Sequence, residues 1–103
     1  MNSHTFKSGT NRGNRRVWLE GDRLLKINVR RGLKFSREFV SDDLVLMFSG
    51  EGRHTVAGTN DRPIIDLNGA YLNEWLGNST GFVATFCAAT DNQPPKISLT
   101  PTA

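Results

Sequence analysis

LEGDRL at residues 19–24 and LNGAYL at residues 67–72 share leucine, glycine and leucine at a constant separation of 48 residues. A run of β-forming residues precedes each motif, and apolar residues at helical spacing follow each glycine. We therefore expect an internal repeat, in which a strand turns at the glycine into a short helix.

The similarity continues beyond the two motifs. Gly32-Leu33 matches Gly81-Phe82 at a separation of 49 residues, and a predicted β-hairpin follows in each half. Strands are predicted at residues 16–20, 33–39, 44–48, 53–57, 63–67, 82–86 and 96–99. The helices are expected to carry Leu24, Leu25 and Ile27 in one half and Leu72, Trp75 and Leu76 in the other, with Asp22 and Asn68 as capping residues. The predicted fold is mainly β with two short helices, a β-rich α+β fold.

The chain has 103 residues, which permits one core but not two. Each half has about 40 residues, too few for an independent core, so we expect the halves to pack together as a pseudo-dimer. The predicted organisation is a flexible basic arm at residues 1–14, one domain at residues 15–100 made of repeats at about 15–58 and 62–100, and a tail at residues 101–103.

Most large apolar side chains are expected in that core. The hydrophobic patterns assign Trp18, Trp75, Phe35, Phe39, Phe48, Phe82, Phe86 and the small Cys87 to it. Phe6 is the exception, because it lies in a polar, basic segment and either docks on the domain or contacts a partner.

Charge is divided unevenly along the chain. Residues 1–37 hold ten Lys or Arg and two acidic residues, a net charge of +8, whereas residues 38–103 hold three and eight, a net charge of −5. Such an asymmetry indicates an anionic partner for the N-terminal portion, and nucleic acid is the commonest such partner for a small domain.

Several classes of protein are disfavoured. The longest apolar run, residues 44–48, is far shorter than a membrane helix, and the N-terminus does not resemble a secretory signal. Cys87 is the single cysteine, so no intrachain disulfide is possible and a cytoplasmic location is expected. Glu51, His54 and Asp61 form the only local group of acid and base side chains, and their spacing does not bring them to one cleft. We expect no enzyme activity, no metal and no cofactor.

The run WLEG at residues 18–21 and the run IIDLNG at residues 64–69 resemble the swapped-hairpin AbrB/MazE group of DNA-binding proteins, the SymE-like branch in particular. That resemblance implies two swapped-hairpin halves in one chain, joined as a pseudo-dimer barrel. The opening NRGNRRVWLEG, residues 11–21, is more loosely similar to small domains associated with phage-type cytosine DNA methyltransferases. The second half departs from a symmetric DNA-binding pattern, because it lacks the basic residues of the first.

The predicted function is that of a small DNA-binding regulator of the repressor or antitoxin type, acting on double-stranded DNA through the basic arm and the first repeat. The residues expected to contact DNA are Lys7, Arg12, Arg15, Arg16, Arg23, Lys26, Arg30, Arg31, Lys34 and Arg37. An alternative is an accessory or inhibitory protein whose basic face occupies a nucleic-acid channel of an enzyme. A SymE-like RNA-cleaving toxin would need a catalytic group that the sequence does not display. Both a monomer and a homodimer are compatible with the repeat.

Overall fold

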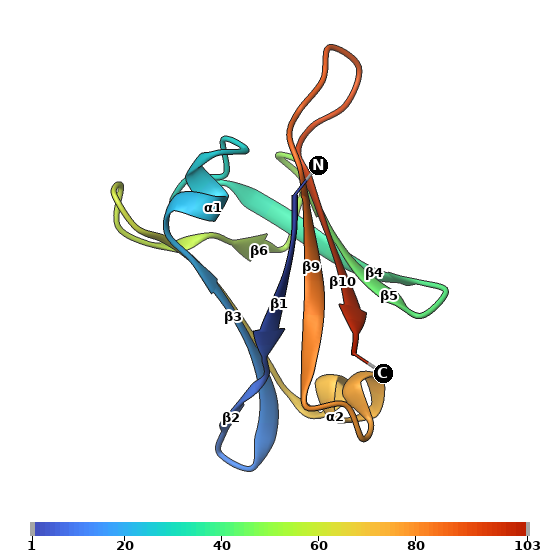
Figure 1. Cartoon of the computed structure of the whole chain (residues 1–103). Helices are drawn as coiled ribbons and strands as arrows, with labels where there is room; N and C mark the ends of the chain where they lie inside the picture. Colours follow the sequence, from blue (N-terminus) through green and yellow to red (C-terminus); the bar gives the residue numbers. More distant parts are fainter. Residues whose placement is uncertain (1, 103) are drawn as a thin grey trace.

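The computed structural model describes residues 2–102, which form two antiparallel sheets and two short helices (Figure 1). The larger sheet has the order β1 (Asn2–Lys7), β9 (Gly81–Cys87), β10 (Lys96–Pro101), β5 (Asp43–Phe48), β4 (Lys34–Val40) and β6 (His54–Thr55). The smaller sheet has the order β2 (Gly9–Asn11), β3 (Asn14–Glu20), β8 (Pro63–Asn68) and β7 (Ala57–Gly58). The helices are α1 (Asp22–Leu25) and α2 (Ala70–Leu76). The prediction of a mainly β fold with two short helices is confirmed.

Both sheets are open. Among residues 2–102, β1 and β6 are the edges of the larger sheet, and β2 and β7 are the edges of the smaller one. The chain crosses between the sheets at Ser8 and again at Val56, and β6 and β7 have only two residues each. Strands this short do not continue the hydrogen bonding around a cylinder, so the described strands do not close into the expected barrel.

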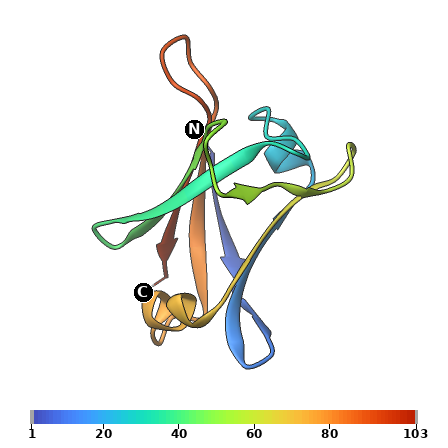
Figure 2. The same ribbon diagram turned by 180° about the vertical axis from the view of Figure 1, so that it is seen from behind.

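One hydrophobic core joins the sheets. The smaller sheet contributes Val17, Leu19, Ile65 and Leu67, the helices Leu24, Leu72 and Leu76, and the larger sheet Phe35, Leu44, Leu46, Phe48, Phe82, Ala84, Phe86, Ile97 and Leu99. Their alternation along the strands is the period of two that the sequence displays. The two helices lie at opposite ends of the molecule in both views (Figures 1 and 2).

A glycine begins each helix. Gly21 and Gly69 precede α1 and α2 with φ angles of 81° and 142°, a region that residues with a Cβ rarely adopt. The expected side-chain caps are wrong, because neither helix has a side-chain hydrogen bond at its N-cap. Asp22 instead lies in the first turn of α1, where its carboxylate faces the positive end of the helix dipole.

The segment predicted as a flexible arm is folded from residue 2 onward. β1 pairs with β9 from Asn2 opposite Phe86 to Lys7 opposite Gly81, and β2 forms a hairpin with β3. The Phe6 ring stacks on Phe82 with centroids 5.5 Å apart. A Cβ on Gly81 would clash with the Phe6 carbonyl, so the glycine lets β1 approach closely.

The residues predicted as a C-terminal tail also belong to the fold. Pro101 ends β10, and the Thr102 amide donates to the Gly81 carbonyl at 3.0 Å. Met1 of the predicted arm and Ala103 of the predicted tail lie outside the described residues.

The element order β-β-β-α-β-β occurs twice, at residues 2–48 and at residues 54–101. Pairings recur with it. Gly9 lies opposite Arg16 in the first half, and Ala57 lies opposite Ile64 exactly 48 residues later. Phe6 lies opposite Phe82 and His54 lies opposite Phe35, so β6 adjoins β4 as β1 adjoins β9.

Two residues assigned to the core are exposed. Trp18 is 38% exposed and Phe39 is 51% exposed, together with Val40 at 50%. Trp18 lies on the face of β3 opposite to the buried Val17 and Leu19, and Phe39 lies near the tip of the β4–β5 hairpin, beyond the core. Trp75 and Cys87 are partly buried.

Candidate functional site

The ten predicted DNA contacts do not form one surface. Lys7 ends β1, and Arg12 lies in the β2–β3 turn with a φ angle of 53°. That turn is at the end of the molecule opposite to α1 (Figures 1 and 2). The other predicted residues divide into three whose guanidinium groups are engaged inside the molecule and five whose side chains make no hydrogen bond or ion pair within residues 2–102, although the Arg23 guanidinium lies 5.3 Å from the centroid of the Phe6 ring.

Arg15 joins the smaller sheet to the end of α2. Its guanidinium donates to the carbonyl oxygens of Gly77 at 3.3 Å and Ser79 at 2.5 Å, and to the Ser8 hydroxyl at 2.5 Å. A cation at the C-terminal end of a helix compensates the partial negative charge of its carbonyls. Arg15 is therefore a structural residue.

Arg16 is held by an acidic partner on the neighbouring strand. Its Nε and Nη2 donate to the two carboxylate oxygens of Asp66, each at 2.8 Å. The same guanidinium lies 4.4 Å from the centroid of the Trp18 ring. The hydrogen bonds from Arg16 lower the pKa of Asp66. A phosphate would have to displace this bidentate pair to reach Arg16.

Arg37 lies between α2 and β6. Its guanidinium carbon is 3.8 Å from the centroid of the Tyr71 ring, and its Nε donates to His54 Nε2 at 3.3 Å. Partial burial, with the charge of Arg37, lowers the pKa of His54 and favours the neutral ring that accepts this hydrogen bond. Burial raises the pKa of Tyr71. Arg37 thus contributes to packing beneath β4.

The remaining five cations lie within residues 23–34, on α1, the loop after it and the start of β4. This α1 surface consists of the exposed side chains of Arg23, Lys26, Arg30, Arg31 and Lys34. Within residues 2–102 none of the five takes part in an ion pair, since the two ion pairs found there are Arg16–Asp66 and Arg62–Glu20. Arg62 forms an ion pair with Glu20 at the end of β3. Among residues 22–34, Asp22 is the one acidic residue.

The α1 surface has a fixed backbone. The Val29 amide donates to the Leu24 carbonyl at 2.9 Å, and the Gly32 amide donates to the Val56 carbonyl at 2.8 Å. Val29 is fully buried, so the loop that carries the adjacent Arg30 and Arg31 is anchored in the core. Exposed side chains on such a frame can meet an anion without ordering the backbone first.

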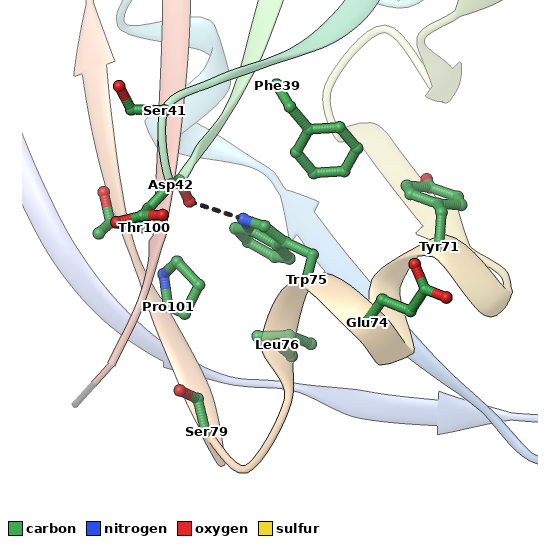
Figure 3. Close-up of a pocket in the computed structure, with 10 residues that line it drawn as sticks. All are labelled: Phe39, Ser41, Asp42, Tyr71, Glu74, Trp75, Leu76, Ser79, Thr100 and Pro101. Atoms are coloured by element: carbon green, nitrogen blue, oxygen red, sulfur yellow. Dashed lines mark hydrogen bonds between the residues drawn. The ribbon is translucent and has the colours of Figure 1, made fainter.

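The other end of the molecule has a pocket of about 580 Å³ beside α2 (Figure 3). The residues of this α2 pocket used below are Phe39, Asp42, Tyr71, Glu74 and Trp75. The Trp75 indole donates to the backbone oxygen of Asp42 at 2.9 Å, which joins α2 to the β4–β5 turn. No lysine or arginine lines the pocket. This pocket was not predicted from the sequence, whose hydrophobic patterns assign Phe39 and Trp75 to the core.

The acid and base group divides between two pockets. Glu51 and His54 line a pocket beside β4, whereas Asp61 lines another beside Asp22. No group of three His, Cys, Asp or Glu in residues 2–102 is arranged to hold a metal ion. In the same range, neither helix has the length and apolar composition needed to cross a membrane.

Comparison with known proteins gave no relative: the chain matches no protein-family model, no curated protein and no solved structure.

Proposed function

We propose that this chain binds DNA through the α1 surface. The observation that carries the proposal is the group of five exposed cations that no acidic side chain of the described residues neutralises. Lys and Arg displace counterions condensed on nucleic-acid phosphates, and this release drives binding. Three arginines among the five also suit phosphate groups, because a guanidinium presents paired donors.

We further propose that residues 2–48 and 54–101 are two repeats that form a single-chain pseudo-dimer. The recurring element order, the positive φ of Gly21 and Gly69, and strand pairings 48 residues apart support this. The bounds of these repeats differ from those predicted from sequence: the first begins with β1 rather than at residue 15, and β6 and β7, predicted as one strand at the end of the first repeat, begin the second. The likeness to swapped-hairpin DNA-binding proteins, and with it a role as a small regulator, stays a prediction.

Duplex DNA suits the α1 surface better than single strands. Recognition of unpaired bases uses aromatic side chains that stack on them, and residues 22–34 contain no aromatic residue. Contacts to the phosphates of a duplex, which Lys and Arg side chains make, need no aromatic residue. If all five cations neutralise a phosphate, the logarithm of affinity should fall with the logarithm of salt at a slope of about −4.5.

The test is fluorescence anisotropy of a labelled duplex between about 50 and 300 mM salt. The double variant R30A/R31A should weaken binding by about tenfold or more and reduce the slope by about two. R12A, at the opposite end, is the matched control and should retain the wild-type affinity. Absence of binding at the lowest salt, or equal losses in both variants, would refute the proposal.

A further inference from the structure

The outer edge of β4 is unpaired over most of its length. On that side β6 pairs only with Lys34 and Phe35, so the backbone from residue 36 to residue 40 has no strand partner within the described chain. Phe39 and Val40 are both half exposed beside this edge. An open edge with exposed apolar side chains is a template for a further strand.

The equivalent edge in the other half is covered. β1 pairs with β9 along six residues, and its Asn2 and His4 line a pocket of about 280 Å³. The other residues of that pocket are Asp22 and Arg23 of α1, Lys26 and Ile27 just after the helix, and Phe86 of β9. Added along an edge in this way, a strand directs alternate side chains towards the neighbouring helix. The chain therefore contains an example of how such an edge is completed.

The two pockets have corresponding walls. Counting 48 residues from Arg23, Lys26 and Ile27 leads to Tyr71, Glu74 and Trp75, all of which line the α2 pocket. Phe82 lies opposite Phe6 and Phe35 lies opposite His54, which relates β4 to β9 by 47 residues, two fewer than the match of Gly32 to Gly81. Continued along β4, this relation places Phe39 where the other half has Phe86. The counterpart of β1 in the second half is β6, which has only residues 54–55, so within residues 2–102 no strand extends along β4 beside the α2 pocket as β1 does in the first half.

The chemistry of the two pockets is opposite. In the covered pocket two cations, Arg23 and Lys26, outnumber one acid, Asp22, whereas the α2 pocket carries Asp42 and Glu74 and three aromatic rings (Figure 3). Aromatic faces and carboxylates together favour a cationic side chain, through cation–π and charge interactions. Arg37 on Tyr71 already shows a guanidinium on one of these rings.

We propose that β4 and the α2 pocket bind an extended, basic segment of a partner protein. The segment adds as an antiparallel strand along residues 36–40, and the side chain opposite Phe39 carries Lys or Arg into the α2 pocket. Main-chain hydrogen bonds supply affinity and the pocket supplies selectivity. This inference rests on the proposed correspondence of the two halves, and it does not depend on DNA binding.

The test uses the ¹⁵N-labelled full chain and two blocked peptides, TKTKTKT and TETETET, which differ only in charge. The lysine peptide should shift the amide signals of residues 36–40 and the Trp75 indole signal, and should bind at least about fivefold more tightly than the glutamate peptide. Equal binding of the two peptides would overturn the proposal, as would shifts confined to β9 or no shifts at all.

Two charge-reversed variants at corresponding positions complete the design. Glu74→Lys should remove the preference for the lysine peptide, and Lys26→Glu should leave it unchanged. Both side chains are exposed, so both variants should fold, which unchanged amide spectra away from the substitution would verify. Retained preference in Glu74→Lys would contradict the role of the α2 pocket. DNA affinity of wild type is measured separately, so failure of one proposal is distinguishable from failure of the other.

Discussion

The two halves of this molecule have the same order of elements and opposite surfaces. Residues 22–34, from α1 to the start of β4, contain five basic residues and one acid, whereas the corresponding residues 70–82 contain one acid and no base. Leu24 and Leu72 occupy matching positions in the two helices, and both are fully buried. The buried pattern is thus shared, and the difference between the halves lies in side chains that face water.

This contrast indicates how one framework offers two kinds of site. Core positions are constrained by packing density, so exchanges there are costly. Exposed positions are nearly free of that constraint, and a change of charge alters the partner rather than the fold. We infer that the α1 surface serves an anion and the α2 pocket a cation.

The largest effect should come from the matching leucines. Leu24→Ala and Leu72→Ala each leave a cavity in the shared core, and each should lower the free energy of unfolding by about 2–5 kcal/mol. Denaturant unfolding should give a single transition in both variants, because neither half has a core of its own. Two separate transitions would show that the halves fold independently.

Phe6→Ala should have the next largest effect. Phe6 is partly buried against Phe82 and Phe86, and its loss should cost about 1–3 kcal/mol and loosen β1. Hydrogen exchange would then quicken at the amides that join β1 to β9 and remain slow between β5 and β10. His54→Ala, the corresponding change at β6, should cost less, because that strand has two residues.

Lys26→Glu and Glu74→Lys sharpen the comparison of charge. The first reverses a cation of the α1 surface and should weaken DNA binding by several-fold, with a shallower salt slope. The second adds a cation at the other end and should change DNA affinity by less than about twofold at 0.15 M salt, where charges more than about 8 Å apart are screened. Similar losses in both variants would contradict two distinct surfaces.

The smallest expected effect is on stability below neutral pH. Since the folded protein lowers the pKa of His54, the unfolded chain binds a proton more readily. His54 therefore stabilises the fold above its unfolded pKa of about 6.5, and this contribution is lost as pH falls through its folded pKa. His54→Gln should show a weaker decrease in unfolding free energy between pH 7 and pH 5. An unchanged decrease would assign it to other groups.

The strands and helices were largely predictable because their alternation and helical spacing are local signals. The prediction failed where a remote partner decides the structure. Residues 2–7 have a single large apolar side chain, and they become β1 because β9, with Gly81 at its start, offers an edge some 80 residues away. Without knowledge of the β9 edge, the polar residues 2–7 are interpreted as a flexible arm.

The candidate site was predictable in composition but not in arrangement. Counting charges directs attention to the first half, yet it does not separate Arg30, whose side chain is exposed, from Arg16, which Asp66 binds 50 residues away. Trp18 and Arg16 show the same limit of prediction. They lie on the face of β3 that is turned away from the core, and the neighbouring strands decide which face that is. The α2 pocket requires the β4–β5 turn and α2 to meet, and no local pattern encodes that contact.

The most direct test of the central claim is a titration of the ¹⁵N-labelled chain with a short DNA duplex, followed by amide chemical shifts. We predict shifts concentrated in residues 23–34, with little change in residues 70–80 or in the β2–β3 turn. Shifts centred on α2 or on the turn at Arg12, or the absence of any shift at low salt, would contradict it.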